Sequence, residues 1–256
     1  MTKVGMVCVG AAAVLLVAGF NVRVAARRGG NASTALQSST SASGTGEIVG
    51  KVYFRGKAPM LRPIRMDKDP VCASQQSGTV LPEDGRVNEN GTLPNAFVHI
   101  SKGTGNLSAP APTKPATLTQ KGCLYDPHVL GIVVGQRLQV ISEDQTTHNI
   151  HIRPKENREW NVTQQPGQLL VTTKFSHPEI MIPVRCNLHP WMEAFIGVVS
   201  NPYFAVTGDD GSFVIRGVPL GDYTLAIWTA TFGTQERQAT VRSGESTTVD
   251  FTFASE

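Results

Sequence analysis

The segment Cys186-Asn187-Leu188-His189-Pro190-Trp191-Met192 constrains this chain more than any other. It places a thiol, an imidazole and a thioether within one tight loop, and the apolar stretches 180–184 and 194–199 flank it. Such stretches predict strands, so the loop joins two neighbouring strands that can hold it rigidly. One Cys and two His in a plane, with a weak axial Met, bind copper in both of its oxidation states. A second imidazole must therefore come from elsewhere in the chain.

That second imidazole is predicted to belong to His148, which lies 38 residues (186 − 148) before the cysteine. It follows a polar turn and begins a short β-like stretch, His148–Ile152. Because successive side chains of a strand point to opposite faces, His148 shares the inward face with Ile150, whereas Asn149 and His151 lie on the other. We expect His151 at the surface and keep it as the alternative ligand.

The pair His148-Asn149, followed by Cys186-x-x-His189-x-x-Met192, resembles the ligand pattern of the cupredoxins, small blue copper proteins such as plastocyanin and amicyanin. The resemblance implies a Greek-key β-sandwich with one type 1 copper per chain, bound by these two His, the Cys and the Met. On the outward face, the Asn149 amide is placed to tie its strand to the ligand loop. The alternative interpretation is a buried thiol beside a surface His, with Met192 filling the core.

The cupredoxin resemblance also implies a function, that of a one-electron carrier with an unidentified redox partner protein. Trp191 is interpreted either as a core or rim aromatic or as part of an apolar surface around a partly exposed His189, where such a partner docks. A copper enzyme such as a nitrite reductase needs a second metal, and no further cluster of three His is visible in the sequence. We therefore expect no enzymatic activity. His128 and His177 lie close to prolines and are interpreted as ordinary loop residues.

Two other classes of function stay open. One is a copper storage or delivery protein. The other is a surface-binding module, with a cell-surface glycan as its partner, in which the copper domain is only a scaffold. Redox titration distinguishes the carrier from the storage protein, and glycan-binding assays test the module.

An apolar run near the N-terminus indicates that the protein is exported. Val4–Phe20 is an apolar run of 17 residues, long for the core of a signal peptide and short for a membrane-spanning helix. Residues 1–28 are predicted to be either a signal peptide or an N-terminal hydrophobic helix that anchors the chain in the membrane, with the rest periplasmic or extracellular. Residues 29–46, rich in Gly, Ser and Thr, are expected to be a flexible linker.

The charge balance excludes nucleic acid as an expected partner. The formal net charge is +3, but residues 1–28 contain four basic and no acidic residues. The remaining 19 of the 23 basic residues are matched by 20 acidic ones. A nucleic-acid binding protein would show a basic face or stripe, and none is indicated.

Three cysteines lie beyond the N-terminal segment, namely Cys72, Cys123 and Cys186. An odd number in an exported protein leaves one thiol free or bound to a metal. With Cys186 as a metal ligand, Cys72 and Cys123 are expected to form a disulfide. A disulfide between Cys123 and Cys186 would instead remove the copper site.

The fold class is predicted to be all-β, because 25 Gly and 16 Pro punctuate short stretches rich in Val, Thr and Ile. Two turns, Thr207–Phe213 and Pro219–Tyr223, resemble those of the carboxypeptidase regulatory-like, or transthyretin-like, family. This resemblance implies a smaller β-sandwich at 201–256, after a cupredoxin-like domain at 47–200. In the alternative arrangement, residues 47–101 pair with the C-terminal domain, because Gly50-Lys51-Val52 and the strand after Pro94 resemble its missing first strands.

Overall fold

The computed structural model describes residues 44–255 except 104, 106, 108 and 172–174. The predicted signal peptide or membrane anchor and most of the predicted linker lie outside the described residues. Within the described part of the chain, no helix has the length and apolar character needed to cross a bilayer. The same part confirms the all-β prediction, since its regular structure consists of strands and one five-residue helix, α1 (Pro70–Ser74).

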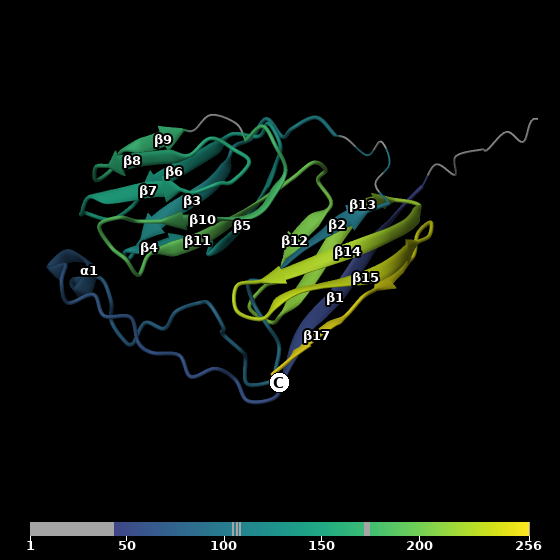
Figure 1. Cartoon of the computed structure of the whole chain (residues 1–256), viewed down its shortest axis with the longest axis horizontal. Helices are drawn as coiled ribbons and strands as arrows, with labels where there is room; N and C mark the ends of the chain where they lie inside the picture. Colours follow the sequence, from purple (N-terminus) through teal and green to yellow (C-terminus); the bar gives the residue numbers. More distant parts are fainter. Residues whose placement is uncertain (1–43, 104, 106, 108, 172–174, 256) are drawn as a thin grey trace, which may run out of the picture. The chain divides into compact units, whose positions relative to one another are not determined.

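The first β-sandwich is formed by residues 116–199 (Figure 1). One of its sheets has the strand order β5-β11-β10-β7-β8, and the other has the order β4-β3-β6-β9. The strands are β3 (Ala116–Lys121), β4 (Leu124–Asp126), β5 (Val129–Val133), β6 (Leu138–Ser142), β7 (His148–Ile152), β8 (Trp160–Gln164), β9 (Leu169–Val171), β10 (Glu179–Arg185) and β11 (Glu193–Val199).

Alternation of apolar residues explains the packing of this first sandwich. In β6, Leu138 and Val140 are fully buried, whereas Gln139 between them is only half-buried. In β7, Ile150 and Ile152 are buried in the same core. Removing such side chains from water is the main favourable contribution to folding, so one face of each sheet is committed to the core.

The second β-sandwich combines strands from the two ends of the described chain (Figure 1). One sheet has the order β13-β1-β16, with β17 also paired to β1, and the other has the order β12-β2-β14-β15. The strands are β1 (Thr45–Arg55), β2 (Phe97–Lys102), β12 (Phe204–Val206), β13 (Ser212–Pro219), β14 (Gly221–Thr229), β15 (Gly233–Val241), β16 (Ser246–Thr248) and β17 (Phe251–Ala254). The first sandwich is thus inserted, in sequence, between β2 and β12.

Pairing in the second sandwich is extensive. Strand β1 is antiparallel to β13, with Gly50 opposite Phe213, and β2 lies between β12 and β14. Gly50 is required at its position, because a Cβ there would lie 1.9 Å from the carbonyl oxygen of Val249. The two N-terminal strands therefore share both sheets and the core with the C-terminal strands.

A small apolar cluster joins the two sandwiches. It contains Phe97 of β2 together with Val129 and Val199 of the first sandwich. Nearby, the ring of Phe204 packs directly on Gly131, where a Cβ would lie 2.0 Å from the ring. Contacts this tight leave no room for an added methyl group.

The segment between β1 and β2, residues 56–96, is called the strap. It contains α1, which begins at Pro70 directly after the N-cap residue Asp69, a residue pair typical of a helix N-terminus. The predicted disulfide between Cys72 in α1 and Cys123 in the turn between β3 and β4 is present, and Cys186 is a free, buried thiol. The disulfide ties the strap to one end of the first sandwich.

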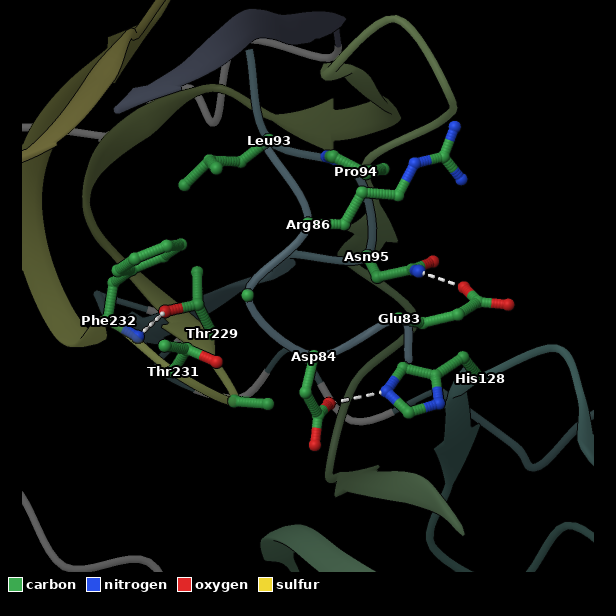
Figure 2. Close-up of a pocket in the computed structure, with 12 residues that line it drawn as sticks. Glu83, Asp84, Arg86, Leu93, Pro94, Asn95, His128, Thr229, Thr231 and Phe232 are labelled. Carbon is green, nitrogen blue, oxygen red and sulfur yellow. Dashed lines mark hydrogen bonds and ion pairs between the residues drawn. The ribbon is translucent and has the colours of Figure 1, made fainter. Parts of the chain in front are cut away.

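A second contact between the strap and the first sandwich is made by His128, which precedes β5 (Figure 2). Its Nε2 donates to Asp84 over 2.6 Å, and its Nδ1 donates to the carbonyl oxygen of Glu193 over 3.1 Å. Burial opposes protonation, but the hydrogen bond to Asp84 outweighs it and raises the pKa of His128. His128 lies in a loop, as predicted, but it is not an ordinary loop residue, because its side chain is buried and both its ring nitrogens have hydrogen-bond partners. His177 is exposed in a loop, as expected.

Candidate metal centre

The ligand loop lies between two paired strands. Cys186 follows β10 directly and Met192 precedes β11, and the strands pair antiparallel with Arg185 opposite Glu193. The loop is closed by the backbone, since the N–H of Cys186 donates to the carbonyl of Met192 and the N–H of Met192 donates to the carbonyl of His189. Its ends therefore move only if the sheet moves.

His148 reaches the same place because β7 is the neighbour of β10, with His151 opposite Arg185. The ligand atoms of His148, Cys186 and His189 all lie within 4.8 Å of one another. The Cys186 sulfur is 3.7 Å from Nδ1 of His189, and the Nδ1 atoms of the two imidazoles are 3.0 Å apart. The exposed fractions of the three residues are 0%, 3% and 5% in chain order. Three of the four predicted ligands are thus brought together in a buried cluster.

Met192, the fourth predicted ligand, is fully buried. It belongs to the apolar core of the first sandwich, together with the cysteine of the loop. Its place in the loop is fixed by its own backbone hydrogen bonds. Axial coordination by its thioether stays a prediction.

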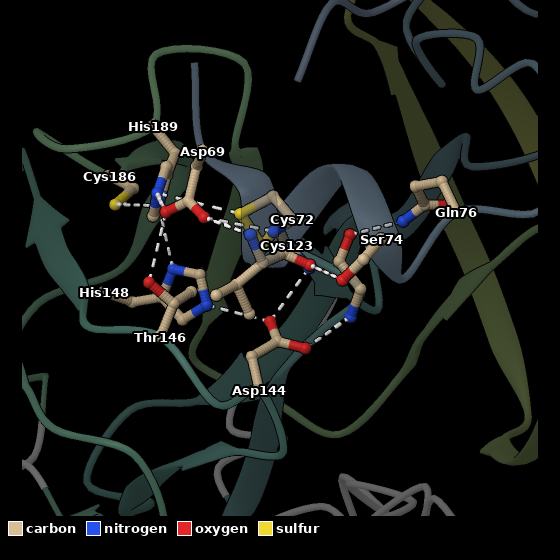
Figure 3. The surroundings of a disulfide bond; sticks show 12 residues. Asp69, Cys72, Ser74, Gln76, Cys123, Asp144, Thr146, His148, Cys186 and His189 are labelled. Carbon is tan, nitrogen blue, oxygen red and sulfur yellow. Dashed lines mark hydrogen bonds and ion pairs between the residues drawn. A yellow bond between two sulfur atoms is a disulfide. The ribbon is translucent and has the colours of Figure 1, made fainter. Parts of the chain in front are cut away.

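The outer nitrogens of both imidazoles meet carboxylates (Figure 3). Nε2 of His148 lies 2.8 Å from Asp144, and Nε2 of His189 lies 2.9 Å from Asp69. Burial opposes ionisation, but hydrogen bonds lower the pKa of both carboxyl groups, so they are ionised and can only accept. Each Nε2 must therefore carry a hydrogen. In the neutral tautomers the two Nδ1 lone pairs then face each other, so the gap between them can hold either a proton on one ring or a metal cation.

The thiol and the first imidazole have unusual acidities. Burial raises the pKa of Cys186, but hydrogen bonds from His148, from the N–H of Asn149 over 3.3 Å and from the ligand loop lower it to about 7. Burial lowers the pKa of His148, but its contacts with Asp144 and the thiol raise it to about 9. A thiolate is the form of cysteine that binds metals, and this environment stabilises it.

Asn149 links strand β7, which carries His148, to the ligand loop, which carries Cys186 and His189. Its side-chain oxygen accepts from the N–H of Asn187 over 3.2 Å, and its amide donates to Asn161 over 2.8 Å. It therefore ties β7 to the ligand loop through its amide. The side chain of His151 points away from the cluster of His148, Cys186 and His189. It contacts Asn187 and Glu159 instead.

The strap covers the imidazole of His189. One of the two interpretations of Trp191 assumed a partly exposed His189, and this interpretation is wrong, because His189 is only 5% exposed. Asp69 lies against its Nε2, and the sulfur of Cys72 lies 3.8 Å from the same atom. Trp191 packs beside it with ring centroids 5.1 Å apart and donates to the carbonyl of Cys123.

The donors fit copper. A thiolate and two imidazole nitrogens, with a thioether at the end of the same loop, form the mixed soft and borderline set of mononuclear copper sites. A structural zinc site prefers four strong Cys or His ligands, and the buried cluster offers three. The four candidate ligands were predicted from the sequence, whereas the two carboxylates behind the imidazoles, Asp69 and Asp144, were not. The position of Asp144, four residues before His148, could have indicated that the two lie close together. For Asp69 the sequence indicated only that it could cap a helix.

Comparison with known proteins gives one family match. The carboxypeptidase regulatory-like domain matches residues 194–254. The match includes β12 to β17, whereas β1 and β2, which complete the same sandwich, lie outside it. No curated protein matches the chain.

Solved structures similar to this chain include copper proteins. A copper-containing nitrite reductase from Thermus scotoductus SA-01 is 20% identical over 40% of this chain and 25% of its own, with a TM-score of 0.32. A purple cupredoxin from Nitrosopumilus maritimus is 20% identical over 33% of this chain and 99% of its own, with a TM-score of 0.29. An oxidised amicyanin variant is 18% identical over 33% of this chain and 82% of its own, with a TM-score of 0.30. This chain thus spans about a quarter of the nitrite reductase. The metal centre is inferred from the side chains described above and from none of these likenesses.

Proposed function

We propose that this chain is an exported protein that binds one copper ion through Cys186, His148 and His189, with Met192 as the fourth ligand, and carries single electrons. The observation that carries the proposal is the pair of facing Nδ1 atoms, 3.0 Å apart beside a buried thiol. Export is supported by the disulfide, because such bonds persist in oxidising compartments.

When bound, copper supplies a one-electron couple, and the chain supplies the fixed ligands. Strands β7, β10 and β11 hold the donors in place, so that little reorganisation is needed when the charge of the centre changes. The apolar core around the loop excludes water from the cluster. The proposal includes no bond-making chemistry by the chain itself.

The visible absorption spectrum of the copper-loaded, oxidised protein tests the proposal. We expect an intense charge-transfer band from the Cys186 thiolate. Cys186→Ser should abolish the band, whereas His151→Ala should leave it, because His151 lies outside the cluster. A wild-type protein that takes up copper but stays colourless after oxidation would contradict the proposal. Loss of the band in His151→Ala would move the ligand to that residue.

A redox titration then distinguishes the carrier from a storage or delivery protein. A carrier should cycle reversibly between its two states with the metal retained. Release of the ion on reduction or oxidation would favour storage or delivery instead.

A further inference from the structure

The carboxylate behind His148 is held by three donors. Oδ2 of Asp144 accepts from the imidazole and from the N–H of Cys123 over 2.9 Å, while Oδ1 accepts from the N–H of Gly122 over 2.6 Å. The side chain is almost completely buried. Its orientation, and with it that of the imidazole, is therefore fixed by the turn between β3 and β4.

The carboxylate behind His189 is held in the same manner by the strap. Oδ1 of Asp69 accepts from the N–H groups of Val71 and Cys72 over 2.9 and 3.1 Å. Oδ2 accepts from the imidazole over 2.9 Å and from the hydroxyl of Thr146 over 3.1 Å. One oxygen is thus held mainly by the backbone, and the other is directed at the imidazole.

The two supports are joined by one covalent bond. Cys72 and Cys123, whose N–H groups hold the two carboxylates, are the two halves of the disulfide, with Cα atoms 5.5 Å apart. Each carboxylate requires the hydrogen on Nε2, which leaves Nδ1 free to face the other imidazole and the thiol. The disulfide therefore connects the outer partners of both imidazoles (Figure 3).

We propose that Asp69 and Asp144, joined through the Cys72–Cys123 disulfide, are positioning residues that hold the two imidazoles with Nδ1 toward the metal and lower the copper reduction potential. This inference rests on the proposed function. A carboxylate on the outer N–H makes an imidazole more basic, and a more basic ligand favours the more highly charged Cu(II).

Asp69→Asn is the sharpest test. Asn is as good a helix N-cap as Asp, so its oxygen keeps the backbone donors of α1 and its NH2 group then faces the N–H of His189. Cu(II) affinity should fall by about 10–100-fold. A tenfold loss confined to Cu(II) raises the reduction potential by about 59 mV. Asp67→Asn is the matched control, because that exposed carboxylate pairs with the exposed side chain of Arg65, and its replacement should change neither quantity.

Asp144→Asn should shift the potential in the same direction, and so should the disulfide-free variant Cys72→Ala/Cys123→Ala. A copper-independent measurement is ¹⁵N NMR of the metal-free protein, in which the Nε2–H signal of His189 should lose its strong hydrogen bond in Asp69→Asn. This measurement separates a change at the imidazole from a change in metal loading.

The outcomes separate the inference from the proposed function. If the wild-type protein forms no copper–thiolate band, the proposed function fails and the inference fails with it. If the band forms but Asp69→Asn and Asp144→Asn keep the wild-type affinity and potential, the inference alone is wrong. If both Asp variants shift the potential and the disulfide-free variant does not, the role of the disulfide is wrong.

Discussion

Removal of the Cys72–Cys123 disulfide should cost a large part of the stability of this protein. The bond joins residues that are 51 positions apart in sequence. The enclosed segment runs from the strap through β2 in the second sandwich and back to β3 in the first. In the chain-entropy description, a crosslink closing a loop of this length destabilises the unfolded chain by about 4 kcal/mol. Most domains are stable by only about 5–15 kcal/mol.

Cys72→Ala/Cys123→Ala is the appropriate variant, because both side chains are completely buried and alanine adds no polar atom. Urea unfolding should show a free energy of unfolding lower by about 4 kcal/mol. The slope m should increase, because the unfolded chain without the crosslink exposes more surface.

Reduction provides the internal control for this prediction. A disulfide reductant should lower the stability of the wild-type protein to that of the double variant and should leave the double variant unchanged. A loss below about 1 kcal/mol with an unchanged slope would refute the reasoning. The strap would then be held by its other contacts, such as the hydrogen bond between Asp84 and His128.

Three further predictions concern packing, protonation and the axial ligand. Gly131→Ala should lower the free energy of unfolding by about 1–3 kcal/mol, because its methyl group collides with the ring of Phe204; unchanged urea unfolding would contradict this. The pKa of His128 in the folded protein is raised above its unfolded value of about 6.5. Its ion pair with Asp84 should therefore stabilise the protein fully below a pH of about 6.5. This stabilisation should be lost as the pH rises through the folded-state pKa. His128→Gln should flatten this part of the stability profile measured by urea unfolding, and an unchanged profile would refute the assignment. Met192→Gln should lower the reduction potential measured by redox titration, because an oxygen donor favours Cu(II) over Cu(I). The blue colour should survive in altered form. An unchanged spectrum and an unchanged potential would mean that Met192 only packs in the core.

The local parts of the fold could be predicted from the sequence. Strand β7 follows from alternation of its side chains and β10 from a continuous apolar stretch, and the ligand loop follows from the spacing of its residues after β10. Three cysteines lie beyond the N-terminal segment, and one of them, Cys186, was assigned to the metal. This was enough to predict the disulfide between the other two, which the structure contains. In contrast, β3 was not predicted, because Gln120 occupies a fully buried position in it and breaks the expected pattern.

Long-range partners were decided only by the tertiary structure. Asp69 and His189 are 120 positions apart, and no periodicity in the sequence relates them. Their contact depends on the path of the strap between the two sandwiches and on the disulfide that fastens it. The candidate metal ligands could therefore be predicted from the sequence, because ligand chemistry and loop spacing are local. Only the tertiary structure decided that a carboxylate lies behind each imidazole and that His189 is covered, because those contacts arise from packing between distant segments.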